Sequence, residues 1–383
     1  MVKDFFPQGI ATGDAFLGRD EEMTTLRNNI NSGHHTLLIA PRRYGKTSLA
    51  LNVLKKLKIP TVEINFFLAV TEKAVERKII AGVEELIKKI TSKPENLIRI
   101  MQNFLKKAHK KWTFSFKGIS LEFTPDKEDD PANNILTILQ LAEHILSNQK
   151  QKAVLFLDEV QEFESLKEGK AIEGAIREFA QKSKYLVFMF SGSNRRLLKN
   201  MFDDKAAPLF ELCDRIQLNR LETDIYKYYL QSVAKKTWKT TLLDEVLDTI
   251  ISLSQRHPRR IYNLCHVLWE DHGKSEPPKS RKAVELAWEK VLNHRLKDIR
   301  YALYQSLNAG QIKVLSLVAS GLTTEFTGKI GQQKTALSAP TIMGHLKTLE
   351  DLDYLERNKD GQYNIIDPII YNIVKRYDLD NLE

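Results

Sequence analysis

Cysteine and long apolar runs are both scarce in this chain of 383 residues. The two cysteines, Cys213 and Cys265, lie far apart without the spacing of metal ligands, so we expect a reducing compartment and no cysteine metal site. No apolar stretch is long enough to span a bilayer, and the first residues, interrupted by Pro7 and Gly9, show no signal-peptide pattern. These absences favour a cytoplasmic protein without a membrane partner.

Acidic residues are in the minority, because 58 Lys and Arg stand against 49 Asp and Glu and the formal net charge is +9. A basic balance favours acidic partners such as nucleic acid. The lysines are spread, however, through stretches such as 55–58 and 106–111, where they alternate with apolar residues as on solvated helix faces. Charge alone is therefore weak evidence for nucleic-acid contact. The length allows two or three domains and a sizeable core.

The most informative segment is a loop between an expected strand and an expected helix. The apolar run 37–39 leads into Ala40-Pro41-Arg42-Arg43-Tyr44-Gly45-Lys46-Thr47-Ser48, and a helix-prone stretch continues to residue 57. This order surrounds an anion with backbone N–H groups and a helix N-terminus, and it positions Lys46 for the β- and γ-phosphates of a nucleotide. Thr47 would offer its hydroxyl to Mg²⁺. We assign Ala40 to Ser48, here called the phosphate loop, to nucleotide binding.

Two features of the phosphate loop bear on this assignment. A chance Gly-Lys-Thr tripeptide in a basic loop would lack the flanking strand and helix that are present here. The usual pattern also has glycine at the first position, where this chain has Ala40. Because glycine adopts positive φ freely and alanine does not, the loop geometry at that position is an open point.

A second apolar run, 153–157, ends in Asp158 and Glu159. Such a run is typical of a buried parallel strand whose C-terminal end faces a ligand. In phosphoryl-transfer sites, the first acid holds Mg²⁺ and the second orients or activates the attacking water. An ordinary core strand followed by solvated acids would explain the run by itself. Its combination with the phosphate loop favours Asp158 as a metal ligand and Glu159 as the general base.

A third apolar run, 186–190, ends in Ser191-Gly192-Ser193-Asn194. A polar side chain at the tip of a strand beside the Asp158 strand can contact the γ-phosphate or the attacking water, and Asn194 or Ser193 suits that role. The alternative is a plain strand-to-helix turn in which Asn194 is the helix N-cap. The sequence leaves both interpretations open.

Together these motifs resemble the archaeal-type P-loop ATPases, which belong to the group that joins the AAA+ and STAND ATPases. The resemblance extends to Phe16-Leu17-Gly18-Arg19-Asp20-Glu21-Glu22, to Arg256-His257-Pro258-Arg259-Arg260 and to Tyr363-Asn364-Ile365-Ile366-Asp367-Pro368, and so covers nearly the whole chain. It implies an α/β P-loop NTPase with a doubly wound, mainly parallel sheet, followed by an all-helical lid and a C-terminal winged helix. Arg256 departs from the pattern, which usually has glycine there.

The resemblance also implies roles for single residues in nucleotide binding. The element containing Arg19 would lie near the adenine. In the lid, Pro258 would approach the nucleotide, and Arg259 or Arg260 would reach a phosphate. The positive end of the helix dipole disfavours a basic pair at a helix start. The presence of these two arginines there therefore favours a role in binding a ligand.

Arg215 stands just before the strand-like run 216–218, where AAA+ proteins often place an arginine finger that acts on a neighbouring subunit. It could equally form a surface ion pair with Asp214 or Glu211. If Arg215 is such a finger, the protein forms a nucleotide-dependent homo-oligomer, and no other residue of the sequence points to one.

The pattern along the chain predicts three parts. Residues 1–221 alternate strands and helices as an ATPase core requires, with a β-hairpin inserted at about 112–124. Residues 222–309 repeat apolar positions at helix spacing and form the helical lid. Residues 310–383 contain a helix with Pro340 just inside its start and a two-stranded wing with an Asp-Gly turn, which is a winged helix-turn-helix pattern.

The winged helix offers few basic residues for nucleic acid. His345 and Lys347 lie on the exposed side of its third helix, and Arg357 and Lys359 in the wing could contact phosphates of double-stranded DNA. Acidic residues lie close by, namely Glu350, Asp351 and Asp353. A winged helix that mediates protein contacts, or that packs on the ATPase core, is an equal alternative.

We therefore predict an enzyme that binds and hydrolyses ATP with Mg²⁺. Its winged helix would couple it to DNA, or to a mobile-element, defence or regulatory partner. The alternative is an ATP-gated signalling or assembly switch that acts on protein partners without nucleic acid. A scaffold with a relic site is disfavoured because Lys46, Thr47, Asp158 and Glu159 are all intact.

Overall fold

The computed structural model describes residues 2–90, 100–101, 103–104, 113–117, 120–124, 130–322, 324–358 and 360–376. The chain forms two compact units. The sheet unit comprises Arg19–Ala40 and Leu49–Leu218, and the helical unit comprises Met1–Gly18, Pro41–Ser48 and Asn219–Glu383. Most of the phosphate loop thus belongs to the helical unit, although the strand that precedes it belongs to the sheet unit. The predicted division at residues 221 and 309 stays a prediction.

The sheet unit is built on a five-stranded sheet with the order β2-β5-β6-β1-β7. All neighbouring strands run parallel, which confirms the predicted sheet. Two of the three interior strands, β5 and β6, are buried along their whole length, as their apolar runs indicated. The strands are β1 (Thr36–Ile39), β2 (Thr61–Asn65), β5 (Ala153–Asp158), β6 (Leu186–Gly192) and β7 (Asp214–Gln217).

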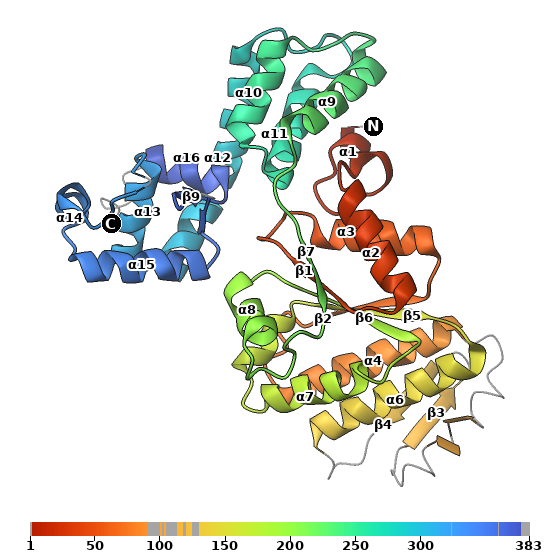
Figure 1. Ribbon diagram of the computed structural model, residues 1–383. Coiled ribbons are helices and arrows are strands. Elements are labelled where there is room, and N and C mark those ends of the chain that lie inside the picture. The colour runs from red at the N-terminus through yellow and green to blue at the C-terminus, as the bar shows by residue number, and fades with distance from the viewer. Residues whose placement is uncertain are drawn as a thin grey trace. The chain divides into compact units, whose positions relative to one another are not determined.

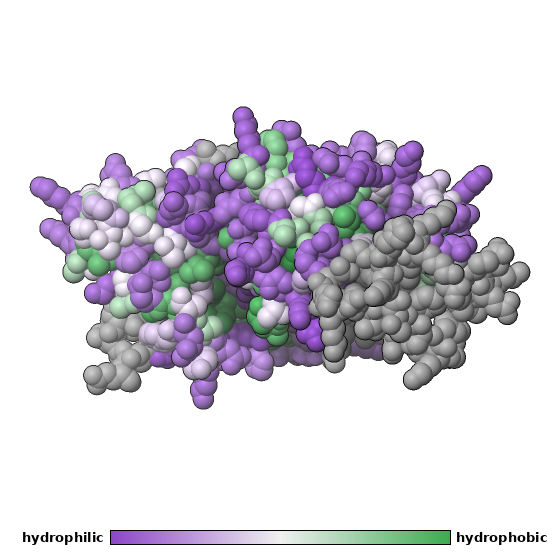
Figure 2. Space-filling view, turned by 90° about the horizontal axis from the view of Figure 1, so that it is seen from below, coloured by the Kyte–Doolittle hydropathy of each residue, from purple (hydrophilic) through white to green (hydrophobic). Residues whose placement is uncertain are grey.

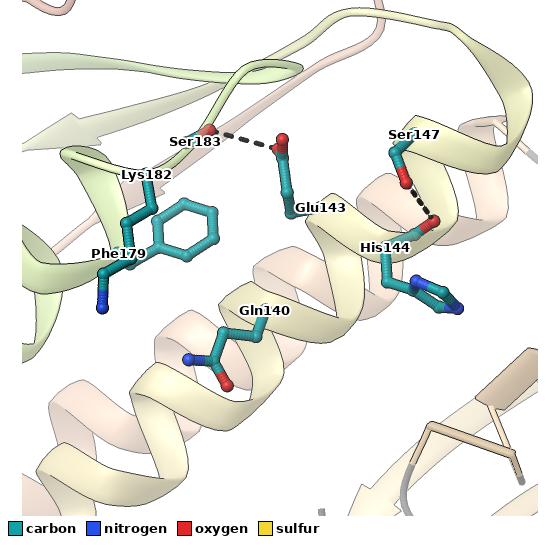
Figure 3. A pocket seen from close by; sticks show the side chains of 7 residues that line it. All are labelled: Gln140, Glu143, His144, Ser147, Phe179, Lys182 and Ser183. Atoms are coloured by element: carbon teal, nitrogen blue, oxygen red, sulfur yellow. Dashed lines mark hydrogen bonds between the residues drawn. The ribbon is translucent and has the colours of Figure 1, made fainter. Parts of the chain in front are cut away.

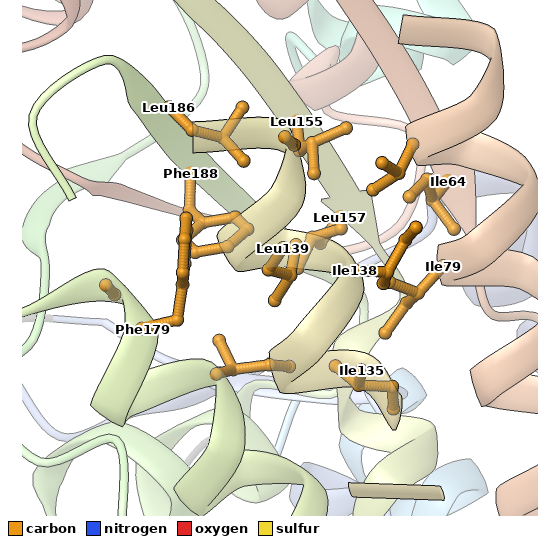
Figure 4. Packing of buried hydrophobic residues seen from close by; sticks show 14 of the residues in the cluster. Ile64, Ile79, Ile135, Ile138, Leu139, Leu155, Leu157, Phe179, Leu186 and Phe188 are labelled. Atoms are coloured by element: carbon orange, nitrogen blue, oxygen red, sulfur yellow. The ribbon is translucent and has the colours of Figure 1, made fainter. Parts of the chain in front are cut away.

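Helices cover both faces of this sheet (Figure 1). Side chains of the central strands, such as Leu155 and Phe188, pack against Ile79, Ile138 and Phe179 from the helices of one face (Figure 4). Each such buried side chain contributes about 1.5–3 kcal/mol to folding. The helices are α2 (Asp20–Ser32), α3 (Lys46–Leu57), α4 (Glu72–Ile90), α6 (Pro131–Gln149), η2 (Val160–Ser165), α7 (Gly169–Ala180) and α8 (Arg195–Asp203).

The segment in which the hairpin was expected contains two paired strands. β3 (Thr113–Lys117) and β4 (Ser120–Thr124) are antiparallel, with Lys117 beside Ser120. Residues 112, 118 and 119, which include the expected turn, lie outside the described residues.

The helical unit has its own core, in which the N-terminal segment takes part. Phe6 is fully buried and meets the rings of Tyr229, Tyr262 and Trp269 edge-on. This part contains α1 (Val2–Phe5), η1 (Gly13–Ala15), α9 (Thr223–Trp238), α10 (Asp244–Ser254), α11 (Pro258–His272) and α12 (Arg281–Ser306). Tyr229 also donates a hydrogen bond to the carbonyl of Phe5, at 2.7 Å. The first residues are therefore part of the packed structure.

The C-terminal end of the helical unit has a second, smaller core that includes Ile312, Ile342, Leu346 and Leu355. Its elements are α13 (Ala309–Ala319), α14 (Lys329–Thr335), α15 (Ala339–Asp351), β8 (Leu355–Arg357), β9 (Tyr363–Ile365) and α16 (Pro368–Arg376). Three helices followed by an antiparallel hairpin are the order predicted for the winged helix-turn-helix. Among the described helices, none combines the length and the hydropathy needed to cross a membrane. Figure 2 shows a face on which hydrophilic residues predominate.

Candidate functional site

The two acidic residues of the predicted site lie at the carboxyl edge of the sheet. Asp158 ends β5, and the register places it beside Asn65, the last residue of β2. The Asp158 carboxylate is mostly buried and accepts hydrogen bonds from the Ser191 hydroxyl and from Nδ2 of Asn65, the latter at 3.2 Å. Both neighbouring strands therefore orient this carboxylate, because the carboxyl ends of parallel strands meet at one edge.

Glu159 is held in a defined orientation immediately after the strand. Its φ of 57° lies in the left-handed region, which residues other than glycine seldom adopt. Its Oε2 atom accepts three hydrogen bonds, from Nε2 of Gln161 at 2.6 Å, from the Ser193 N–H at 3.0 Å and from the Ser193 hydroxyl at 2.8 Å. Unusual backbone angles that the surroundings maintain occur preferentially at functional sites.

Gln161 approaches the backbone of β6 closely. A Cβ atom at Gly192 would overlap its Oε1 atom, so any larger residue at this position would require Gln161 to shift. Oε1 is buried and has no hydrogen-bond partner among the described residues, whereas Nε2 binds Glu159. The side chain of Gln161 is thus wedged between Gly192 and the carboxylate.

Three residues around the acids had no role assigned from the sequence, namely Asn65, Gln161 and Ser191. Asn65 also accepts a hydrogen bond from the Phe67 N–H through Oδ1, at 2.8 Å, and so links the loop after β2 to Asp158. The available signal was a polar residue at the end of each strand neighbouring the Asp158 strand. Which of these polar residues reaches which acid depends on strand order, and the sequence does not contain that information.

The phosphate loop begins where β1 ends, and Ile39, the last residue of β1, stands beside Gly192. Positive φ angles occur at Arg43, with 67°, and at Gly45, with 96°. Ala40 has no positive φ and is fully buried, so alanine can replace the usual glycine there without strain. α3 starts at Lys46, which places a helix N-terminus at the end of the loop, as predicted.

The side chains at the start of α3 differ in exposure. Lys46 is mostly buried, and its Nζ lies 3.4 Å from the carbonyl oxygen of Pro41 within the loop. Thr47 is half-buried. Ser48 is buried, and its Oγ accepts a hydrogen bond from the Ala11 N–H at 3.0 Å. Ser48 therefore anchors the N-terminal segment.

Solved structures share this fold over nearly their full length. A Walker-type ATPase of Pyrococcus abyssi matches with a TM-score of 0.70 at 15% identity, covering 98% of this chain and 100% of that one. The ORC2 protein of Aeropyrum pernix, in ADPNP–ADP complexes, gives 0.58 at 14% identity and 97% coverage of each chain. This chain has the fold of the P-loop ATPases. The resemblance that the motifs indicated is thereby confirmed at the level of the fold.

The ORC1 protein of Aeropyrum pernix in complex with DNA matches with a TM-score of 0.50 at 15% identity, covering 99% of this chain and 97% of that one. Neither a protein-family model nor a curated protein sequence matches the chain.

Within this P-loop ATPase fold, Tyr44 of the phosphate loop is buried inside the helical unit. Its hydroxyl accepts a hydrogen bond from Nε of Arg220 at 3.0 Å, and its ring meets that of His257 edge-on. Burial lowers the pKa of His257 to about 3, although Asp367 opposes the shift. His257 is therefore neutral, and its Nδ1 accepts the Arg259 N–H as the N-cap of α11.

The basic pair of the expected lid divides between two environments. Arg260 is nearly fully buried and donates to both carboxylate oxygens of Asp367, with 2.8 Å between Nε and Oδ1. Burial would raise the pKa of Asp367, but Arg260, together with His257 and a hydrogen bond from the Ile369 N–H, holds that pKa below its usual value. Arg259 is half-buried, and burial, together with Arg43, Arg260 and Arg295, lowers its pKa to about 10. Arg259 is thus the better candidate for an anionic ligand.

The remaining assigned residues are distributed as follows. Asn194 is the N-cap of α8, because its Oδ1 accepts the Leu197 N–H at 3.1 Å. Arg215 forms an ion pair with Asp203 and donates to the Phe202 carbonyl at 2.9 Å, rather than pairing with Asp214 or Glu211.

Two further nucleotide-site assignments lie at helix starts. Arg19 is nearly buried and pairs with Glu22 at 2.8 Å at the start of α2. Pro258 is the first residue of α11. The roles in nucleotide binding that the resemblance implied for these residues stay predictions.

The four residues assigned to nucleic acid also differ in solvent exposure and in their contacts. Lys347 is exposed on α15, and His345 is half-buried. Arg357 lies over the ring of Tyr363, with 4.6 Å between its Cζ and the ring centroid, and pairs with Glu350 at 3.3 Å. Lys359 lies outside the described residues.

A cavity of about 260 Å³ between α6 and α7 is a separate feature of the sheet unit (Figure 3). One of its polar lining residues is Glu143, whose carboxylate accepts hydrogen bonds from the Ser183 hydroxyl and from the N–H groups of residues 184–186. Because these bonds hold the chain that leads into β6, we attribute Glu143 to the fold.

Proposed function

We propose that this chain binds ATP with Mg²⁺ and hydrolyses it. The observation that carries the proposal is the acid pair at the end of β5, where Asp158 and Glu159 are each oriented by polar groups of neighbouring segments. β1 ends at the same edge and continues into the phosphate loop. The ADPNP–ADP complexes of the Aeropyrum ORC2 protein, which has a similar fold, support nucleotide binding.

The backbone of the phosphate loop is suited to binding a nucleoside triphosphate. Positive φ angles at Arg43 and Gly45 turn the backbone, and α3 begins at Lys46. In this proposal, the loop N–H groups and Lys46 hold the phosphates, whereas Thr47 and Asp158 hold Mg²⁺. No cluster of three or more acidic, histidine or cysteine ligands occurs among the described residues. Mg²⁺ does not need such a cluster, because it binds through one or two carboxylates together with substrate phosphates.

The residues of the chain then divide the chemistry. Bound Mg²⁺ would neutralise charge on the phosphates. Glu159 orients a water molecule and accepts its proton, and Ser193 and Gln161 keep its carboxylate in place. Asn65 and Ser191 keep Asp158 in place. We assign Arg259, the second residue of α11, to contact a phosphate, as the resemblance implied.

ATP turnover by the wild type and by Glu159→Gln tests this function. We expect hydrolysis by the wild type, and a fall of about a hundredfold or more in Glu159→Gln with nucleotide binding retained. Lys46→Ala should lose binding. Glu168→Gln, which removes an exposed carboxylate before α7, is the matched control and should retain activity. Equal rates in wild type and Glu159→Gln would contradict the proposal.

We further propose that the C-terminal end of the helical unit, with its winged-helix order of elements, couples the ATPase to double-stranded DNA. The complex of the Aeropyrum ORC1 protein with DNA supports this role, as does the exposed Lys347 on α15. Duplex DNA should then raise the turnover rate, and added salt should weaken the effect. The Cys213 and Cys265 thiols are free, which fits the cytoplasmic location that we propose.

A second candidate function is an ATP-gated switch that acts on protein partners. The specific observation in its favour is that Arg357 is engaged by Glu350 and Tyr363, so that fewer basic side chains remain for phosphates. This switch predicts turnover that is indifferent to DNA and oligomers that form with ATP but not with ADP. The arginine-finger role of Arg215 belongs to the same test, because a finger would have to leave Asp203 to act on a neighbouring subunit.

A further inference from the structure

Arg220 contacts three segments of the helical unit that lie far apart in the sequence. Its Nε donates to the Tyr44 hydroxyl at 3.0 Å, and its Nη1 donates to the carbonyl of Gln255 at 2.8 Å. Its Nη2 donates to the carbonyl of Ile366 at 2.9 Å and to Oε1 of Glu356 at 3.1 Å. One guanidinium therefore joins the phosphate loop, the end of α10 and the hairpin of β8 and β9.

The contacts of Arg220 use the planar fork of the guanidinium. All three nitrogen atoms donate, in different directions, which the single ammonium of lysine cannot reproduce. The side chain is only 18% exposed, and Glu356, its carboxylate partner, is 25% exposed. A charge shielded to this degree interacts more strongly with its partner than an exposed surface pair does.

A second connection runs parallel to the first. Asp367, the residue after Ile366, binds Arg260 and lies 3.9 Å from Nη1 of Arg43. Two consecutive residues of the phosphate loop are thus connected to two consecutive residues after β9. Arg43 has a positive φ of 67°, so the loop conformation at this point depends on surrounding contacts.

We propose that Arg220 is a positioning residue that couples the phosphate loop to the β8–β9 hairpin, so that nucleotide binding and the C-terminal elements affect each other. The inference rests on the proposed nucleotide binding and adds its regulation. Tyr44 is fixed from the hairpin side through Arg220, and a change in the hairpin contacts therefore alters the loop. Thermodynamic linkage requires the reverse effect as well.

Glu356 gives the sharpest test of this coupling. It lies on β8 and pairs with Arg220, so its effect on the phosphate loop passes through Arg220. Glu350→Gln is a matched control, because Glu350 is a half-buried carboxylate of the same part of the chain that pairs with Arg357 instead. Tyr44→Phe removes the hydroxyl that Arg220 contacts on the loop side.

The experiment measures the Kd of a fluorescent ADP analogue with the full chain. We expect Glu356→Gln and Tyr44→Phe each to change the Kd about fivefold or more, and Glu350→Gln to leave it unchanged. The Glu356→Gln/Tyr44→Phe double variant should change the Kd by less than the product of the two single effects, because both act through one guanidinium. This cycle does not require Arg220 itself to be replaced, so it stands even where Arg220→Gln fails to fold.

Hydrogen exchange supplies a readout that a purely structural role would not alter. ADP should slow exchange of the β8 and β9 amides in the wild type, and this effect should be lost in Tyr44→Phe. A wild type that binds ADP while Glu356→Gln and Glu350→Gln behave alike would overturn the coupling and leave the proposed function intact. A wild type that binds no nucleotide would overturn both.

Discussion

Ser193 holds Glu159 with two hydrogen bonds to the same carboxylate oxygen. The Ser193 N–H lies 3.0 Å and its hydroxyl 2.8 Å from Oε2 of Glu159. The backbone bond survives any substitution at this position except proline, whereas the hydroxyl bond depends on the side chain. Ser193 therefore allows the orientation of the proposed general base to be weakened without removing it.

We expect Ser193→Ala to lower the kcat for ATP hydrolysis by about tenfold, because a hydrogen bond to a charged group contributes about 1.5–3 kcal/mol. The KM should change little, since Ser193 orients Glu159 rather than the nucleotide in our proposal. Steady-state kinetics separate the two constants. Ser193→Thr, which keeps a hydroxyl, should retain most of the rate. An unchanged kcat in Ser193→Ala would show that the backbone bond suffices.

Asn194 distinguishes the two roles that the sequence left open. If Asn194 acts as the N-cap of α8, Asn194→Ala should lower the unfolding free energy by about 1 kcal/mol, measured by urea denaturation. Asn194→Ser, which retains a capping oxygen, should recover most of that loss. The kcat of both variants should equal that of the wild type. A large fall in kcat for Asn194→Ser would instead support contact with the γ-phosphate or the attacking water.

Gly192 allows a test of the wedged position of Gln161. Gly192→Ala places a Cβ where Oε1 of Gln161 lies, so we expect a loss of about 1–3 kcal/mol in unfolding free energy. The displaced Gln161 would also release Glu159 and lower the kcat. In the Gly192→Ala/Gln161→Ala double variant, the stability should largely return, because the overlap is removed. A double variant as unstable as Gly192→Ala alone would contradict this account.

We expect Glu173 on α7 to make the unfolding free energy depend on pH. It is fully buried, and burial raises its pKa to about 7, although Lys170, 3.4 Å away, opposes the rise. The native state therefore binds more protons than the unfolded state between the ordinary pKa of 4.5 and about 7. The stability that this carboxyl group contributes is fully present below its ordinary pKa of 4.5. It is lost as the pH rises through about 7.

Urea denaturation between about pH 5 and about pH 8 measures this dependence. Glu173→Gln should flatten the fall across that interval, because the neutral amide does not titrate. Glu178→Gln, which removes an exposed carboxylate of the same helix paired with Lys182, should leave the fall unchanged. The same slope in wild type and Glu173→Gln would assign the dependence to other groups.

Local patterns in the sequence predicted the fold and the ends of the proposed site. The apolar runs before Asp158 and Ser191 became β5 and β6, because a strand buried on both faces requires continuous apolar residues. The phosphate loop and the start of α3 were also predictable, because backbone angles and helix starts depend on adjacent residues. Even the replacement of glycine by Ala40 has a local answer, because that residue has no positive φ.

Contacts between distant residues were decided only by the tertiary structure. The strand order makes Asn65 and Ser191 partners of Asp158, and the turn after β5 directs Gln161 to Glu159. Similarly, two adjacent arginines of equal charge differ because packing buries Arg260 on Asp367 and leaves Arg259 half-buried.

The sequence by itself therefore determined the fold class, the phosphate loop and the acid pair, all of which depend on short-range patterns. The tertiary structure decided which side chains orient the acids and how Arg220 joins the phosphate loop to the C-terminal hairpin. The physical reason is that hydrogen bonds and ion pairs act over a few ångströms, and only packing brings residues 44, 220 and 356 within that range.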